Sequence, residues 1–289
     1  MIGTAAVLSP AQRRSFDDEG YLLLRGALDV ERDIEPIRRD LGRLIDVCAV
    51  GHGVRIDDTP DFDARFLQLV REAPDVNSVI YDAAKNLVPF VRLTVHPTIE
   101  AIASELRGSD FVGSASLGQG VRIDRPHETR HQLPWHQDFP YQLRSADGIV
   151  FWIPLVSITE DMGPVELCVG SHRLGALPLE AASGLEDAAV KEGVYDGLRI
   201  RGETELAARY DKVAVTTEPG DVLLFDFFAI HRSGHNVSAK TRWSAQIRYF
   251  NFLEEFGRSS GWRGSFKTGK TVGQINESLG KVQRYRDAR

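Results

Sequence analysis

The chain has 289 residues, of which 42% are hydrophobic and 26% are charged. These proportions are those of an ordinary globular protein and exclude a collagen-like, coiled-coil or intrinsically disordered chain. A formal net charge of −6 opposes binding to a phosphate backbone, so we expect no nucleic-acid partner. The N-terminus lacks the features of a signal peptide and no long apolar stretch occurs, so the sequence favours a cytoplasmic protein without a membrane partner.

The first hundred residues carry a series of helix signals. Ser9-Pro10 is a helix start, and Gly20 ends the polar run that follows it. A compact apolar strand is predicted over residues 21–24. Apolar residues three or four positions apart then predict further helices. These helices cover residues 30–47, 62–72, 76–87 and 97–106.

From residue 111 onward, glycines, β-branched residues and alternating polarity replace the helical spacing. The predicted strands cover residues 111–123, 149–156, 165–169, 213–217, 222–225 and 242–250. An acidic, alanine-rich insertion over residues 175–210 interrupts them, and a terminal helix is predicted over 272–282. Strands without regularly interleaved helices predict a sandwich or barrel rather than a parallel α/β sheet.

The segment 242–250 has two chemically different faces when it is read as a strand. One face carries Arg242, Ser244, Gln246 and Arg248, and the other carries Trp243, Ala245, Ile247 and Tyr249. A half-exposed strand at an outer edge has this pattern. So does a strand whose apolar face packs on a helical layer while its polar face lines a ligand-filled barrel interior.

A candidate metal site comes from two separate segments. His136 and Asp138 form a His-x-Asp sequence, which can present an imidazole nitrogen and a carboxylate oxygen to one metal ion. A third ligand must come from elsewhere, and His231 is well placed because it follows an apolar strand where a loop begins. Two imidazoles and one carboxylate form the facial triad of non-haem Fe(II) oxygenases, which leaves positions open for a bidentate 2-oxo acid and dioxygen.

The ordered set of motifs resembles the phytanoyl-CoA dioxygenase family of Fe(II)/2-oxoglutarate-dependent oxygenases. The matching segments are residues 136–138, 151–155, 163–173 and 219–231, followed by Ser233, Asn236 and Arg242. Arg242 lies eleven residues beyond His231, as the resemblance requires. The resemblance extends over roughly residues 20–250 and includes the strand that begins at Tyr21.

The resemblance implies a mainly β fold with α additions. Its core would be a double-stranded β-helix, related to the jelly-roll and cupin folds, with a helical layer drawn mostly from the N-terminal third. We therefore expect one domain over residues 1–289. Its parts would be a helical support over about 1–107, the core over about 110–250 and a C-terminal extension over 251–289.

The resemblance also implies an activity and its cofactors. The protein would use Fe(II), 2-oxoglutarate and O2 to hydroxylate an unactivated C–H bond of a small molecule, and 2-oxoglutarate would become succinate and CO2. His136, Asp138 and His231 would bind the iron. Arg242 would bind the 5-carboxylate of 2-oxoglutarate through paired hydrogen bonds, with further help from Ser244 and Arg122. An acidic residue at position 138 favours a hydroxylase over a halogenase, since halogenating relatives have a small residue there.

Substrate residues are predicted from their position beside the ligands. Gln137, Phe139 and Tyr141 flank the metal-binding residues, although packing explains Phe139 equally well. Arg130, in the loop before His136, is predicted to receive an anionic substrate. Two other functions remain open: a metal-dependent jelly-roll isomerase or lyase, and a non-catalytic small-molecule binding module. The sequence indicates no oligomeric state.

Overall fold

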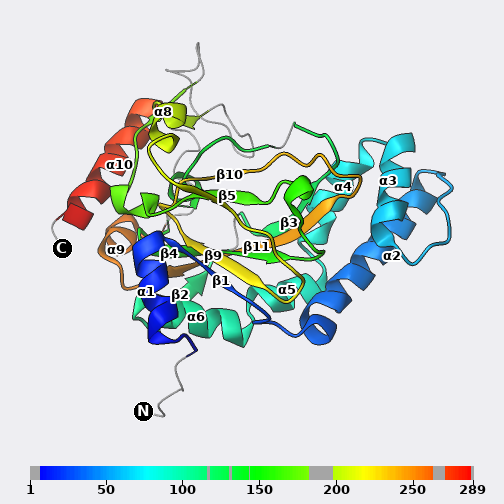
Figure 1. Cartoon of the computed structure of the whole chain (residues 1–289), viewed down its shortest axis with the longest axis horizontal. Coiled ribbons are helices and arrows are strands. Elements are labelled where there is room, and N and C mark those ends of the chain that lie inside the picture. Colours follow the sequence, from blue (N-terminus) through cyan, green and yellow to red (C-terminus); the bar gives the residue numbers. More distant parts are fainter. Residues whose placement is uncertain are drawn as a thin grey trace.

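The computed structural model describes residues 7–115, 118–129, 132–142, 144–181, 198–262 and 271–287. Helices come first along the chain and strands follow, as predicted (Figure 1). The longer helices are α1 (Pro10–Glu19), α2 (Glu35–Gly51), α3 (Phe62–Glu72), α4 (Val76–Ala84), α6 (Pro97–Arg107) and α10 (Val272–Asp287). The shorter ones are η1 (Val30–Ile34), α5 (Val88–Thr94), α7 (Phe139–Gln142), η2 (Glu160–Met162), η3 (Ser171–Leu174), α8 (Glu203–Ala207) and α9 (Glu255–Ser260). Within the described ranges, no helix combines the length and the apolar character needed to cross a membrane.

The strands form antiparallel sheets. They are β1 (Tyr21–Leu24), β2 (Val112–Ser114), β3 (Gly120–Asp124), β4 (Gly148–Pro154), β5 (Val165–Cys168), β6 (Leu179–Glu180), β7 (Arg199–Ile200), β8 (Lys212–Ala214), β9 (Val222–Asp226), β10 (His231–Ser233) and β11 (Arg242–Asn251). The larger sheet has six strands in the order β1-β9-β4-β11-β2, with β3 also paired to β11. A smaller sheet has the order β10-β5-β8, and β6 pairs with β7. The fold is therefore mixed α and β, built on antiparallel sheets.

The first helix and strand form as the local sequence dictates. The Ser9 hydroxyl accepts a hydrogen bond from the Gln12 amide at 3.2 Å, and the Gln12 side chain accepts one from the Ser9 amide at 2.8 Å. This reciprocal cap satisfies amides that the first helical turn leaves without partners. At the other end Gly20 takes the left-handed conformation, with φ at 80°, and turns the chain into β1.

One face of the larger sheet packs on helices. Alternate residues of β11, from Trp243 to Tyr249, share a buried core with α2, α3 and α6. Trp243 is the centre of this contact, because the rings of Phe66 and Trp243 lie 4.8 Å apart in an edge-to-face arrangement. This placement confirms the second interpretation of strand 242–250, in which the apolar face packs on the helical layer.

The other face of the larger sheet meets the smaller sheet. Val150 and Trp152 of β4 and Phe225 of β9 share a second core with Val165 and Leu167 of β5. In Figure 1, β5 and β10 lie on one side of the larger sheet, and α5 and α6 lie on the other. The polar face of β11 therefore points into the space between the two sheets.

Several boundaries differ from the sequence predictions. Residues 111–123 form two strands, β2 and β3, which pair with different parts of β11. The predicted helix 30–47 begins as a π-helical turn and continues to Gly51. Helices α5 and α9 and strand β10 were not predicted, because three to seven residues are too few for periodicity to be visible. Of the insertion 175–210, residues 182–197 lie outside the described residues.

Candidate metal and cosubstrate site

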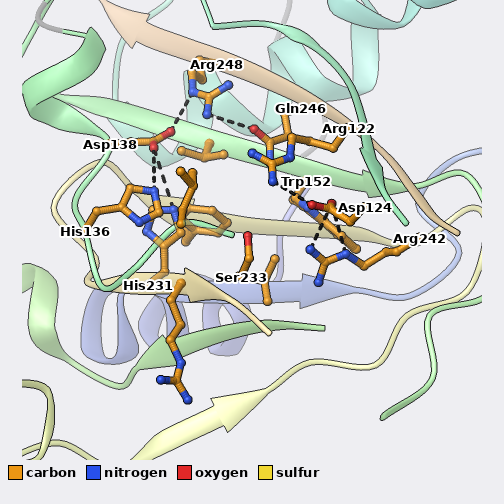
Figure 2. A pocket seen from close by; sticks show the side chains of 15 residues that line it. Arg122, Asp124, His136, Asp138, Trp152, His231, Ser233, Arg242, Gln246 and Arg248 are labelled. Atoms are coloured by element: carbon orange, nitrogen blue, oxygen red, sulfur yellow. Dashed lines mark hydrogen bonds and ion pairs between the residues drawn. The ribbon is translucent and has the colours of Figure 1, made fainter. Parts of the chain in front are cut away.

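The two histidines of the candidate triad are brought together by backbone pairing. His136 lies just before α7 and His231 begins β10, and the two form an isolated antiparallel bridge. The His136 amide donates to the His231 carbonyl at 2.9 Å, and the His231 amide donates to the His136 carbonyl at 3.0 Å. Their ring centroids consequently lie 4.1 Å apart. Residues far apart in the sequence thus share one end of the cavity (Figure 2).

The ligand atoms of His136, Asp138 and His231 converge. All three lie within 4.8 Å of one another. Asp138 Oδ1 is 3.6 Å from His136 Nε2 and 3.8 Å from His231 Nε2. Each Nδ1 donates to a backbone carbonyl, at 2.8 Å to Pro134 and at 3.0 Å to Ala229. Protonation at Nδ1 leaves the Nε2 lone pairs directed toward Asp138, which is the tautomer that metal binding requires.

Burial and charge set the protonation of the triad. Burial lowers the pKa of His231 to about 3, with a further contribution from the neighbouring His136. Burial opposes ionisation of Asp138, but the Arg248 guanidinium and the two imidazoles hold its pKa well below its usual range. A neutral imidazole and an ionised carboxylate are therefore present at neutral pH. These are the forms that bind a metal ion.

The donor set suits a divalent iron ion. Two imidazole nitrogens and a carboxylate oxygen on one side match the two-histidine, one-carboxylate triad of non-haem Fe(II) sites. Neither cysteine takes part, since Cys48 and Cys168 are buried elsewhere. His136, Asp138 and His231 would hold such an ion at one end of the cavity.

A cavity lies between the two sheets. The space inside it and at its open mouth together amounts to about 380 Å³. Residues of β3, β4, β9 and β11 line it from the larger sheet, and residues of β5 and β10 line it from the smaller one. Its lining includes four arginines, Arg122, Arg232, Arg242 and Arg248, and two aspartates, Asp124 and Asp138. The excess of positive charge favours an anionic ligand.

Arg242 lies at the far end of the cavity from the metal ligands (Figure 2). Its Nη2 is 3.0 Å from Asp124 Oδ2, and Arg122 Nη2 is 2.8 Å from Asp124 Oδ1. Asp124 thus joins the two arginines. Although burial opposes ionisation, these guanidinium groups lower the pKa of Asp124 to about 2.

Two buried polar atoms at this end lack a hydrogen-bond partner. Among the described side chains, these are Arg242 Nη1 and Ser244 Oγ, which belong to the same face of β11. Arg242 is 2% exposed and Ser244 is fully buried. A buried donor without a partner is costly, so two of them in one place indicate that a ligand completes the site. A carboxylate fits both groups.

Two of the predicted substrate residues, Gln137 and Phe139, do not face the cavity. Gln137 turns away from the cavity, because its Nε2 donates to the Gly175 and Phe228 carbonyls, both at 2.7 Å, and its Oε1 accepts from the Leu177 amide. Phe139 is fully buried and packs on Phe228. Both placements correspond to structural roles rather than to substrate contact.

The other two substrate predictions have different outcomes. Tyr141 lies near the triad, with its ring centroid 6.3 Å from that of His136, and its hydroxyl donates to the Leu198 carbonyl at 3.3 Å. Arg130 lies outside the described residues. Its role stays a prediction.

Sequence reasoning missed several residues of the site. Arg248 contacts Asp138, Asp124 joins two arginines, and Gln246 and Trp152 line the cavity. Alternation along β11 had already placed Arg248 and Gln246 on the polar face, so that signal was present. Asp124 and Trp152 had no comparable signal, because their role depends on pairing between distant strands.

The sequence is similar to known enzymes over most of its length. The model of the phytanoyl-CoA dioxygenase family matches residues 16–244. The 1-deoxypentalenic acid 11-beta-hydroxylase of Streptomyces arenae is 29% identical over 78% of this chain and 74% of its own length. The ectoine dioxygenase of Sphingopyxis alaskensis is 23% identical over 84% of this chain and 76% of its own length.

Solved structures show the same fold at low sequence identity. The ectoine enzyme EctD of S. alaskensis, solved with 2-oxoglutarate and 5-hydroxyectoine, has a TM-score of 0.56 at 20% identity, over 94% of this chain and 87% of its own. The epimerase SnoN, solved with Fe3+, alpha-ketoglutarate and a nogalamycin compound, has a TM-score of 0.55 at 16% identity, over 90% and 94%. With the family model matching most of its length, the chain belongs to the phytanoyl-CoA dioxygenase family.

Proposed function

We propose that the protein is a non-haem Fe(II)- and 2-oxoglutarate-dependent dioxygenase that hydroxylates a C–H bond of a small molecule. One observation carries this function. A single buried cavity has a His-Asp-His triad at one end and an arginine with an unpartnered Nη1 at the other. A metal isomerase or a binding module does not need the second group. The family and the named hydroxylases among the relatives support the same conclusion.

Each end of the cavity has a separate task in this function. His136, Asp138 and His231 would hold the iron, and Arg242 with Ser244 would bind the remote carboxylate of 2-oxoglutarate. The oxidant would be O2, and the metal and 2-oxoglutarate would activate it, so that one oxygen atom enters the hydroxyl group of the product and the other enters succinate, which forms with release of CO2. The protein binds and orients the reactants and limits access of water. Arg122 acts indirectly, because it shares the Asp124 carboxylate with Arg242.

The double-stranded β-helix core belongs to this proposal, as does the single-domain organisation. The support is the pair of antiparallel sheets around the cavity and the similarity to EctD and SnoN. Strand β1 extends the larger sheet beyond the expected core of about 110–250, since it pairs with β9 in register.

The substrate class we propose is a small molecule with a carboxylate. The support is Arg130, a cationic side chain in the loop before His136 that is not assigned to 2-oxoglutarate. Relatives are named for 1-deoxypentalenic acid, ectoine and L-proline, which are small molecules. If Arg130 receives the substrate, Arg130→Ala raises the substrate KM and leaves turnover of 2-oxoglutarate without substrate little changed. An unchanged KM would show that Arg130 does not bind the substrate.

The test of the proposed function is a spectrum recorded without oxygen. Fe(II) and 2-oxoglutarate are added to the protein, and the weak visible metal-to-ligand charge-transfer band of the chelate is measured. We expect the band in the parent protein, no band in His136→Ala and a weakened band at equal cosubstrate concentration in Arg242→Ala. His235→Ala is the matched control, because His235 is an exposed histidine close to the site and outside the triad. A parent protein that binds one iron but shows no band would contradict the function.

A further inference from the structure

The two oxygens of Asp138 have different neighbours. Oδ1 faces the imidazoles, at 3.6 Å from His136 Nε2 and 3.8 Å from His231 Nε2. Oδ2 accepts a hydrogen bond from Arg248 Nε at 2.7 Å. In Figure 2, Arg248 lies on the opposite side of Asp138 from the two histidines. The carboxylate is therefore held between a cation on one side and the candidate metal position on the other.

Arg248 is itself held in place. Its Nη2 donates to Gln246 Oε1 at 3.1 Å, and its Nη1 donates to the Gly118 carbonyl. The residue is 7% exposed and lies within β11, where it is paired with Val150 of β4. Three contacts from one planar guanidinium fix its orientation. Rotation of the Asp138 carboxylate would break the 2.7 Å hydrogen bond.

This contact limits what Asp138 can offer a metal ion. With Oδ2 engaged by Arg248, only Oδ1 is directed at the metal position. The protein then supplies three ligand atoms in total, and a six-coordinate ion keeps three positions for the cosubstrate and dioxygen. If both oxygens were available, the carboxylate could bind in a bidentate mode and occupy one of those positions.

We infer that Arg248 is a positioning residue that holds Asp138 as a one-oxygen metal ligand and keeps the triad assembled before the metal binds. The inference rests on the proposed function, since it assigns a task within the same site. Partners that orient metal ligands typically contribute about 10- to 100-fold to metal affinity.

The charge of Arg248 has an effect of the opposite sign. A cation close to a metal site repels the incoming ion, so removing the charge alone would tighten metal binding. Removing the positioning contact would weaken it. The sign of the change in affinity therefore separates the two effects.

The experiment measures the affinity for Co(II), used alone as the probe, by visible absorption and chelator competition. The variants are Arg248→Gln, which removes the charge and the fixed contact, and Arg248→Lys, which keeps the charge without the planar fork. Arg232→Gln is the matched control. Arg232 lines the same cavity next to His231, but its Nη2 pairs with Glu166 at 2.8 Å, whereas Arg248 pairs with Asp138. Thermal unfolding checks that each variant is folded.

We expect Arg248→Gln to weaken Co(II) binding by about 10- to 100-fold, with Arg248→Lys intermediate and Arg232→Gln unchanged or tighter. Equal or tighter binding by Arg248→Gln would overturn the inference. If Arg248→Gln does not fold, Arg248→Lys decides alone, and parent-like affinity in that variant would overturn the inference. If the parent itself binds no Co(II), or His136→Ala binds it equally well, the proposed function fails. A failure of the Arg248 inference alone looks different, because the parent then binds Co(II) and His136→Ala does not.

Discussion

The two faces of β11 differ in how their buried polar atoms are satisfied. On the helix side, Trp243 Nε1 donates to Asp63 Oδ1 at 2.8 Å, and the Tyr249 hydroxyl donates to the Thr94 carbonyl at 2.9 Å. On the cavity side, Arg242 Nη1 and Ser244 Oγ are buried and have no hydrogen-bond partner in the part of the chain that the structure describes. Both faces belong to one strand, and Gln246 is the one residue of the two faces that is only partly buried.

The difference separates a core from a binding site. A core must pair its polar atoms within the chain, because nothing else will satisfy them. A binding site can leave donors unpaired when a ligand supplies the acceptor. Substitutions on the helix side should therefore change stability, and substitutions on the cavity side should change ligand affinity. Three substitutions on β11 test this separation, and a fourth prediction concerns Asp124, a cavity residue that is paired with arginines inside the protein.

The largest expected effect is on the helix side. Trp243→Ala removes a fully buried ring and the partner of Asp63, so we expect the free energy of unfolding to fall by about 3–5 kcal/mol. Urea unfolding measures the loss. The folded fraction should bind 2-oxoglutarate with an affinity close to that of the parent. A loss below about 1 kcal/mol would contradict the assignment of Trp243 to the core.

Arg242→Ala is the counterpart on the cavity side. We expect the dissociation constant for 2-oxoglutarate to rise about 100-fold, which corresponds to about 2.7 kcal/mol. The loss comes from charge-assisted hydrogen bonds to the carboxylate. Calorimetry of the Fe(II)-loaded protein without oxygen measures it. Arg232→Ala, in the same cavity, is the control for charge alone. Equal losses of affinity in the two variants would show that the charge of the cavity, and not the position of Arg242, determines cosubstrate binding.

Asp124 predicts a pH dependence of stability. Arg122 and Arg242 lower its pKa to about 2 in the folded protein, below the usual 3.8. The unfolded chain therefore binds more protons between these values, and the stabilisation is present above about pH 4 and lost as the pH falls toward 2. Between about pH 6 and 2.5, the parent should lose about 1–2 kcal/mol more than Asp124→Asn. Asp82→Asn, an exposed carboxylate on α4, should lose as much as the parent.

Ser244→Ala should have the smallest effect. Its hydroxyl has no hydrogen-bond partner among the described residues, so its removal leaves the free energy of unfolding unchanged or slightly higher. The affinity for 2-oxoglutarate should fall about fivefold, or about 1 kcal/mol, through loss of one hydrogen bond. Unfolding and cosubstrate titration on the same preparation measure both. Lower stability with unchanged affinity would show that Ser244 belongs to the core and not to the cosubstrate site.

The difference between the two faces of β11, and the three residues of the triad, could be predicted from the sequence. Alternation along residues 242–250 separated the two faces, because side chains of a strand point in opposite directions in turn. The His-x-Asp sequence and His231 identified the residues that converge in the triad. The orientation of Gln137 was not predicted, because its side chain binds the Gly175 and Phe228 carbonyls, which belong to distant segments.

What the sequence could not predict depends on contacts between distant segments. Asp124 reaches Arg242 only because β3 pairs with β11, and no local pattern identifies that pairing. The contact between Arg248 and Asp138 likewise joins residues 110 positions apart. The absence of partners for Arg242 Nη1 and Ser244 Oγ is a property of packing and has no signature in the chain.

The backbone bridge between His136 and His231 affects how the protein would lose and regain its metal. The two hydrogen bonds of this bridge, at 2.9 and 3.0 Å, hold the segments together without help from an ion. In a zinc finger, by contrast, the metal and the fold depend on each other, and a chelator unfolds the domain. Here a chelator should strip iron from a protein that stays folded, and adding iron back should restore the site without a refolding step.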